Sequence, residues 1–256
     1  METLQIERAD GIVTVTLTRP ERKNAINDVM WDELLATFRG VSQSPDDRVV
    51  VITGAGGAFC SGADLIDPSG RQTNGLTWMR HVGDVCIALH QLRQPVIAKV
   101  TGIAAGAGCN LALGCDLIVA SEEARFSEIF ARRGLALDFG GSWLLPRLIG
   151  LHKAKELALF ADIISAKEAQ DIGLVNRVVA ATEIDAFVDD WARRLAAGPP
   201  IALSLTKKML NASFGATLEE AVEHEARSQV VNFGTADTAE AMQAFLQKRD
   251  PHFTGH

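Results

Sequence analysis

The hydrophobic and polar positions follow a two-residue period near the start of the chain. Residues 4–8 and 11–18 alternate apolar and polar side chains on either side of Ala9-Asp10-Gly11, which predicts a β-hairpin. Residues 48–53 and 96–100 are short continuous apolar runs, typical of strands in a parallel sheet that is covered on both faces. The beginning of the chain therefore predicts several strands of one sheet.

Between these strands, apolar residues recur with the helical spacing. Asn27 is placed to cap a helix whose apolar face holds Met30, Leu34, Phe38 and Val41. Further helices are predicted over residues 76–93, from about Ser142, and over residues 152–161 and 166–172, with strands at 116–120, 124–126 and 174–179. Strands that alternate with helices imply parallel pairing through crossovers. From Ile184 to Lys248 the pattern is helical, with a break at Pro199-Pro200.

The rest of the chain is organised around residues 96–120. An apolar strand leads into a turn with Gly102, Gly106 and Gly108, and then into a helix without a charged residue. The first N–H groups of a buried helix lack intrahelical partners, and they suit an anion or a developing negative charge. This pattern predicts an oxyanion site. A tightly packed turn that needs glycine for space explains the same residues equally well.

Composition narrows the class of protein. The chain has 256 residues, 47% of them hydrophobic, and a formal net charge of −7, so it can bury a sizeable core and is a poor partner for nucleic acid or an anionic membrane. Its four cysteines form no CxxC pair, which predicts neither a metal site nor a disulfide framework, and favours reduced thiols in a cytoplasmic protein. No signal peptide and no apolar run long enough to span a membrane is found.

The glycine-rich loops do not match a dinucleotide-binding motif. The pair Gly54 and Gly56 requires a third glycine where Phe59 stands, and the pair Gly106 and Gly108 requires one where Leu111 stands. The phosphate-binding P-loop motif and the nucleophile elbow of the hydrolases are both absent from the sequence. A Rossmann enzyme is therefore disfavoured.

Two loops together are specific for one family. They are FCSGADL, residues 59–65, and GIAAGAGC, residues 102–109, the latter followed by Cys115-Asp116. With Arg19-Pro20 and Asn24-Ala25 before them, and Phe245, Lys248, Arg249 and Phe253 after them, they resemble the crotonase superfamily of enoyl-CoA hydratases and isomerases over essentially the whole chain. The resemblance implies an α/β fold: a crotonase-like spiral of ββα units in residues 1–183, and a helical C-terminal trimerisation region in residues 184–256.

The resemblance also implies an activity on acyl-CoA thioesters. It assigns the two backbone N–H groups that polarise the thioester carbonyl to Ala63 and Ala107, which fits the oxyanion site predicted above. No separate cofactor is implied, because coenzyme A is part of the substrate. A homotrimer or a dimer of trimers is implied. The matching CoA-binding positions are Arg22, Lys23, Ala25, Ser61, Asp64 and Leu65, with Phe245 and Lys248 reaching the CoA of a neighbouring subunit.

The chain departs from the hydratases of the family at both catalytic carboxylates. Asn110 and Phe130 stand at these positions, and neither side chain can act as acid or base. The nearest carboxylate is Glu128, which at strand spacing would share a face with Phe126 and Phe130. A hydratase that uses a different acid therefore remains possible, as does a non-catalytic acyl-CoA-binding protein.

Asp138 is the favoured catalytic carboxylate. Its loop, residues 134–141, resembles the loop that carries a catalytic carboxylate in the isomerases of the superfamily. Without this resemblance, a role in a turn or at a helix start is the favoured interpretation of the Asp. One carboxylate is sufficient to shift a 3-enoyl-CoA double bond to the 2-position. We expect Leu135, Leu137, Phe139 and Trp143 to form an apolar pocket around it, and residues 66–75 with the C-terminal helices to form the acyl-group walls.

Overall fold

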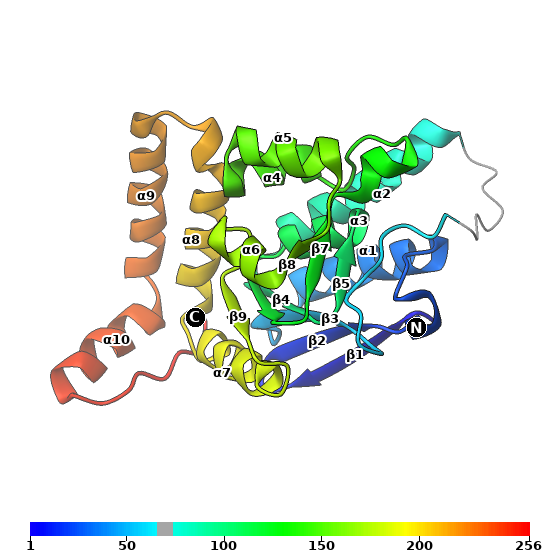
Figure 1. The fold of residues 1–256 in the computed structure, drawn as a ribbon. Helices are drawn as coiled ribbons and strands as arrows, with labels where there is room; N and C mark the ends of the chain where they lie inside the picture. The colour runs from blue at the N-terminus through cyan, green and yellow to red at the C-terminus, as the bar shows by residue number, and fades with distance from the viewer. Residues whose placement is uncertain (66–73) are drawn as a thin grey trace.

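A six-stranded sheet forms the centre of the protein, in a computed structural model that describes residues 1–65 and 74–256 (Figure 1). Strand β1 (Leu4–Ala9) pairs antiparallel with β2 (Ile12–Leu17), which confirms the predicted hairpin. The remaining strands run parallel in the order β2, β3 (Val49–Gly54), β4 (Val96–Val100), β6 (Leu117–Ser121) and β9 (Arg177–Val179). Most of the predicted loop 66–75 lies outside the described residues.

Helices cover both faces of this sheet. Helix α1 (Asp28–Gln43) begins at Asn27, whose side chain accepts a hydrogen bond from the N–H of Met30, as predicted for a cap. Because successive side chains of a strand point to opposite faces, Val50 and Ile52 face the main core with α1, whereas their neighbours face α7 (Ile184–Ala196). Figure 1 shows α1 and α7 on opposite sides of the strands. The continuous apolar runs of the sequence are thus explained.

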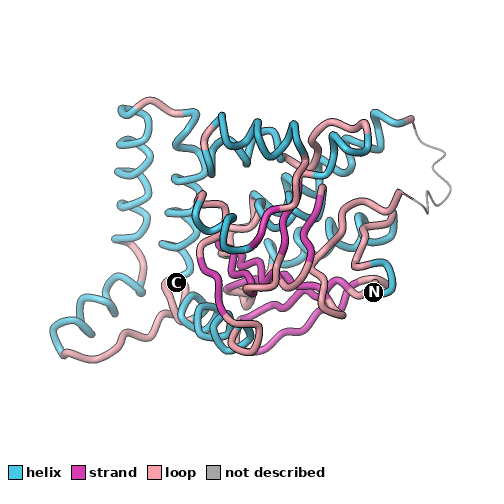
Figure 2. Tube along the Cα trace, in the orientation of Figure 1, coloured by secondary structure: helices cyan, strands magenta, loops and turns pink. Residues whose placement is uncertain are grey.

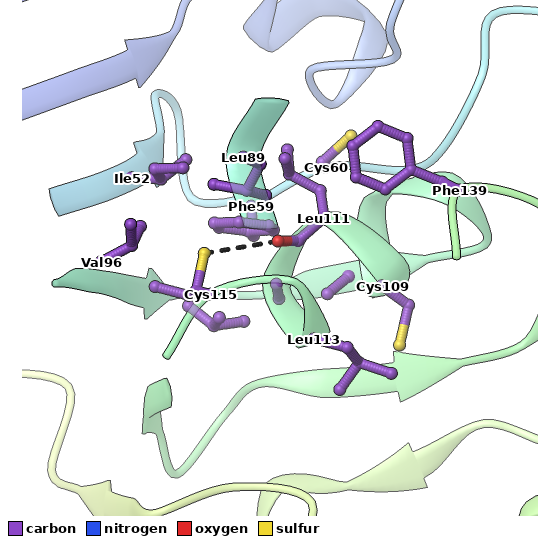
Figure 3. Close-up of a cluster of buried hydrophobic side chains, with 14 of the residues drawn as sticks. Ile52, Phe59, Cys60, Leu89, Val96, Cys109, Leu111, Leu113, Cys115 and Phe139 are labelled. Carbon is purple, nitrogen blue, oxygen red and sulfur yellow. Dashed lines mark hydrogen bonds between the residues drawn. The ribbon is translucent and has the colours of Figure 1, made fainter. Parts of the chain in front are cut away.

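A smaller sheet stands beside the first one. It consists of β5 (Ile103–Ala105), β7 (Arg125–Ser127) and β8 (Ile164–Ser165), with β5 parallel and β8 antiparallel to β7. Helix α3 (Ala107–Leu113) follows β5 directly, and all of its residues are buried. Figure 3 shows the apolar cluster around α3, in which the Cys115 thiol donates to the carbonyl of Leu111.

The segments around Glu128 differ from the prediction. Strand β7 ends at Ser127, and residues Ile129–Arg133 form the 3₁₀ helix η2, so the predicted strand face shared by Phe126, Glu128 and Phe130 is wrong. Another segment, predicted as a strand over residues 174–179, forms a strand only over its last three residues, which are β9.

The elements not yet described are η1 (Pro20–Arg22), α2 (Gly75–His90), α4 (Gly141–Ile149), α5 (Leu151–Phe160) and α6 (Ala166–Asp171).

The last helices extend to one side of the strands, as Figures 1 and 2 show. They are α8 (Pro200–Ala212), η3 (Ser213–Gly215), α9 (Leu218–Phe233) and α10 (Ala236–Gln247). Helix α7 packs on the large sheet, although the predicted boundary at residue 184 assigns it to the C-terminal region. Among the described residues, no helix is long and apolar enough to cross a membrane.

Candidate active site

A cavity of about 560 Å³ opens between α1, α2, the loop after β3 and the segment from β7 to Asp138. Most of the cavity wall is apolar. Its apolar residues include Trp31, Trp78, Val82, Ile129, Phe130 and Leu135. The predicted oxyanion residues Ala63 and Ala107 and the predicted acid Asp138 also line it. The structure therefore brings together residues that are separated by up to half of the sequence.

The two predicted oxyanion loops lie against each other. Gly62 has φ +102°, and a Cβ on it would lie 2.9 Å from the carbonyl oxygen of Ala105 and 3.7 Å from the nitrogen of Ala107, so a side chain has no space here. Next to this contact, Ala63 forms an isolated parallel β-bridge with Ile26. Neither the Ala63 nor the Ala107 N–H donates a backbone hydrogen bond to another described residue outside regular helices and strands. Both N–H groups therefore stay candidates for the predicted oxyanion donors.

Asp138 lies in the loop between η2 and α4, and its main chain is held firmly. Its carbonyl oxygen accepts hydrogen bonds from the Gly141 N–H and from the side-chain amide of Asn110, each at 2.9 Å. The next residue, Phe139, has φ +44°, a left-handed conformation that costs a non-glycine residue about 1 kcal/mol. Phe139 is buried, packs against Trp31 at 5.4 Å between ring centroids, and reaches the apolar cluster around α3 in Figure 3. Core packing thus stabilises this unusual backbone.

Asp138 lines the apolar cavity, and the residue is partly buried. Its Oδ1 atom is buried and has no hydrogen-bond partner among the described residues. Burial raises the pKa of Asp138 to about 6, because the charged form loses hydration. Among the described lining residues, Asp138 is the one carboxylate. A weakly hydrated carboxylate with a pKa close to neutrality is suited to take a proton from a substrate and return it.

Glu128, the alternative acid, lies elsewhere. Its side chain is 2% exposed and lines a separate small cavity with Cys109, Leu145 and Asp162. Burial raises the pKa of Glu128 to about 7, against smaller lowering effects of Cys109 and Asn110. Because Glu128 does not line the large cavity, the geometry separates it from the predicted oxyanion groups.

Three expectations about the cavity wall need correction. Trp143 does not line it: its ring packs edge-on against His90 at 5.2 Å, and the guanidinium of Arg147 lies 3.9 Å from its centroid. Phe139 packs behind the wall. No described residue of α8, α9 or α10 lines it. Two tryptophans that were not predicted from the sequence, Trp31 on α1 and Trp78 on α2, line the cavity. Their place in the wall depends on how α1 and α2 are oriented in the folded chain.

The predicted CoA-contacting segments lie side by side. The Ser61 hydroxyl donates to the carbonyl of Arg22 at 3.1 Å, and its N–H donates to that of Lys23 at 3.0 Å. Arg22, Lys23 and Leu65 are exposed, as a binding surface requires, whereas Ala25 and the Asp64 side chain are buried. The carboxylate of Asp64 forms an ion pair with Arg19 at 2.9 Å.

Phe245 and Lys248 lie far from these segments in the single chain. Phe245 is exposed on α10, and Lys248 follows at the end of that helix, on the opposite side of Figure 1 from α1 and α2. Their predicted contact with the CoA of a neighbouring subunit stays a prediction. Within the described ranges, no group of three or more His, Cys, Asp or Glu residues is arranged to hold a metal ion.

Comparison with known proteins identifies the family of this chain. The sequence model of the Enoyl-CoA hydratase/isomerase family matches residues 7–256. A probable enoyl-CoA hydratase of Rhodobacter capsulatus is 40% identical, with 99% of this chain and 98% of that protein covered. The 1,2-epoxyphenylacetyl-CoA isomerase of Escherichia coli is 38% identical, with 100% and 99% covered.

A solved structure supports the same relationship. The enoyl-CoA hydratase of Bacillus anthracis superimposes with a TM-score of 0.94 at 32% sequence identity, covering 99% of this chain and 100% of that one. The fold is therefore that of the crotonases, as predicted. With the family model matched from residue 7 to the last residue, the chain belongs to the enoyl-CoA hydratase/isomerase family, within the crotonase superfamily.

Proposed function

We propose that this enzyme moves the double bond of a 3-enoyl-CoA thioester to the 2-position, with Asp138 as the proton carrier. The observation that carries the proposal is the cavity itself. It holds one carboxylate among its described lining residues, and this carboxylate shares the space with the N–H groups of Ala63 and Ala107. At the positions of the two catalytic carboxylates of hydratases, this chain has Asn110, which is fully buried, and Phe130. Neither side chain has an acidic group.

The reaction follows from this arrangement. The thioester oxygen accepts hydrogen bonds from the Ala63 and Ala107 N–H groups, which makes the protons on C2 more acidic. The Asp138 carboxylate removes one C2 proton, and the electron pair spreads over a dienolate whose oxygen carries the charge. The carboxylic acid then returns the proton to C4, and the double bond lies between C2 and C3. One group is sufficient for both steps, and the enzyme returns to its starting state.

The pKa of Asp138 fits the two steps. With its pKa raised to about 6, the carboxyl is mostly ionised at neutral pH and is still basic enough to take the proton. Water is not a reactant, and the apolar wall formed by Trp31, Phe130 and Leu137 keeps the reacting carbons away from solvent.

The test is a change in the absorbance of the conjugated thioester. With 3-hexenoyl-CoA, isomerisation produces the conjugated 2-enoyl thioester and absorbance rises. With crotonyl-CoA, hydration destroys the conjugated system and absorbance falls. A rise with the first substrate and no change with the second supports the proposal, whereas a fall with crotonyl-CoA as the faster reaction would favour the hydratase.

The hydratase remains a second candidate for a specific reason. Several similar proteins have hydratase names, among them the short-chain-enoyl-CoA hydratase of Clostridium acetobutylicum at 33% identity. In this chain the water-activating role would have to be taken by Asp138 or by Glu128. A chain that binds acyl-CoA and changes the absorbance of neither substrate would be a non-catalytic homologue.

We further propose that CoA lies over the surface formed by residues 22–25 and 61–65. Arg22 and Lys23 supply positive charge for its phosphates, and the backbone of the second segment runs beside them. A homotrimer, or a dimer of trimers, would bring Phe245 and Lys248 of a neighbouring subunit to the same CoA. The many exposed apolar side chains of α8 to α10 support this assembly.

A further inference from the structure

The described lining residues of the large cavity fall into two groups by their exposure. Trp31 on α1 is 1% exposed, Val82 on α2 is 3% exposed and Phe130 is 5% exposed, so these side chains form an inner end that is removed from solvent. The mouth is formed by lining side chains that are also exposed at the surface, namely Leu65, Met79, Leu135 and Ile163. A bound molecule therefore enters past the mouth and meets the inner end last.

Trp31 is the largest side chain of the inner end, and its ring is held in place. The ring centroid lies 5.4 Å from that of Phe139, the residue that follows Asp138, and both rings belong to the buried core. The N–H of Trp31 donates to the carbonyl of Asn27 at 3.1 Å, in the first turn of α1. Interiors are closely packed, so this indole cannot turn away without leaving a void beside Phe139. Trp31 is thus a rigid part of the wall, next to the loop that carries Asp138.

The proposed reaction fixes the order in which a substrate meets the lining groups. The thioester carbon C1 lies at the N–H groups of Ala63 and Ala107, and the carbons C2 and C4 lie at Asp138. The proposed CoA surface includes residues 61–65, and Leu65 is also part of the mouth, so CoA extends outward from there. The acyl carbons beyond C4 therefore extend away from the mouth, toward the inner end.

We propose that Trp31 closes the acyl pocket and limits the length of the acyl chain, so that the enzyme prefers short-chain 3-enoyl-CoA thioesters to long-chain ones. The inference rests on the proposed function, because the positions of C1 and C4 come from it. Trp31 contacts the acyl tail in this arrangement and determines specificity. It has no part in the proton transfer itself.

The expected effect follows from the burial of methylene groups. In a pocket with free space, each methylene that is moved from water to an apolar wall increases affinity about fourfold. At a closed end this gain stops, because further methylenes meet a rigid ring. A replacement of Trp31 by a smaller side chain should restore the gain for long chains and leave short chains little changed.

The first experiment measures the Kd of hexanoyl-CoA and decanoyl-CoA by calorimetry. These saturated thioesters have no double bond to move, so the measurement does not depend on turnover. In the native enzyme, decanoyl-CoA should bind no more tightly than hexanoyl-CoA. In Trp31→Leu, decanoyl-CoA should bind at least about tenfold more tightly than hexanoyl-CoA. The native ratio in Trp31→Leu, or a tenfold preference for decanoyl-CoA in the native enzyme, would overturn the inference.

The matched control is Trp191→Phe. Trp191 on α7 packs against Phe187 at 5.1 Å between ring centroids, in the core on the other face of the large sheet, and it does not line the cavity. Its replacement should leave the ratio of the two Kd values within about twofold of the native ratio. A shift as large as that of Trp31→Leu would mean that any loss of a tryptophan loosens the pocket, and the assignment of Trp31 would be wrong.

The second experiment compares kcat/KM for 3-hexenoyl-CoA and 3-decenoyl-CoA. Trp31→Leu should raise the ratio of the long to the short substrate at least about tenfold. Trp31→Phe keeps one ring against Phe139 and should give a smaller rise. If both variants lose rate equally on the two substrates, Trp31 supports only the fold of the loop, and the inference fails. Because Trp31→Phe is the milder change, it decides the question if Trp31→Leu does not fold.

The outcome for Trp31 is separable from the outcome for the proposed function. If the native enzyme isomerises neither enoyl substrate, the proposed function is wrong, and the Kd values of the saturated thioesters still decide whether Trp31 closes the pocket. If 3-hexenoyl-CoA is isomerised and the ratios do not respond to Trp31, the function stands and the chain-length limit does not. Far-UV circular dichroism and urea unfolding show whether each variant keeps its fold.

Discussion

The guanidinium of Arg19 lies 2.9 Å from the carboxylate of Asp64, and the two side chains are only 13% and 4% exposed. Arg19 stands just after β2, and Asp64 directly follows Ala63. The ion pair therefore links the turn between β2 and α1 to the loop that contains Ala63, one of the predicted oxyanion donors. Any movement of this loop would shift that donor relative to Ala107.

We expect Arg19→Met to lower the free energy of unfolding by about 3 kcal/mol, because it removes the cation of a buried ion pair with Asp64. Lys153→Ala is the matched control: it removes an exposed ion pair with Glu156 and should cost at most about 0.5 kcal/mol. Urea unfolding of both variants measures the difference. Equal values would mean that the buried pair contributes no more than a surface pair.

Asp138→Asn and Asp138→Ala should each reduce isomerisation at least about 100-fold, since both remove the base. Product-CoA affinity should stay nearly unchanged, because the carboxyl has no part in the predicted CoA contacts. Rates with 3-hexenoyl-CoA and calorimetric titration with product-CoA test the two statements. The control is Glu128→Gln, which should be mild; if it abolishes activity while Asp138→Asn does not, the proton carrier is Glu128.

Ala107→Pro should lower turnover far more than CoA affinity, because it deletes one N–H donor at the thioester oxygen. Ala107 is the first residue of α3, a position where proline fits the helix geometry. Loss of one such donor costs roughly 3–4 kcal/mol of transition-state stabilisation in other enzymes. Steady-state kinetics of the folded variant give the answer. Turnover within a few-fold of the native enzyme would show that Ala107 is not a donor.

Folding stability should fall as the pH rises from 5 to 8, and Glu128 should account for much of the change. In the unfolded chain Glu128 releases its proton near its ordinary pKa of 4.5, whereas the folded protein keeps it up to a pKa of about 7. The folded state binds more protons between these values, so its stability decreases across the window, by roughly 3 kcal/mol for this group.

Glu128→Gln is neutral at every pH and should remove this part of the slope. Asp138 contributes in the same direction, because burial also raises its pKa, from 3.8 to about 6. Urea unfolding of the native protein and of the variant at pH 5 and pH 8 is the measurement. The same loss of stability in both proteins would mean that Glu128 is already ionised in the folded state at pH 5.

We expect the protein to form a trimer or a dimer of trimers through its C-terminal helices. Exposed apolar side chains on and between these helices include Leu210, Phe214, Leu218, Val222, Phe233, Met242, Phe245 and Leu246. So much apolar surface is unusual on a monomer and typical of an interface. Sedimentation velocity at micromolar concentration tests the assembly, and a stable monomer would contradict it.

The helices and strands followed largely from local patterns. Asn27 marked a helix start that the structure contains, and the predicted break at Pro199-Pro200 separates α7 from α8, because capping and the fixed φ of proline act within one turn. The expected strand face shared by Phe126, Glu128 and Phe130 failed for the opposite reason. Alternation of apolar residues near Glu128 resembles a strand, but the chain turns into a 3₁₀ helix where its partner strand β5 ends.

The sequence by itself determined the family and the two glycine-rich loops, and it led to the expectation that Asp138 takes the place of the hydratase carboxylates, since all of these rest on residue identities at fixed spacing. Only the tertiary structure decided which of the two residues lines the large cavity. Asp138 and Glu128 are ten positions apart, yet one lines the cavity with Ala63 and Ala107 and the other lies buried beside Cys109 and Asn110. The direction of a side chain depends on backbone angles and on packing partners from distant segments, such as Phe139 against Trp31, and no local pattern contains that information.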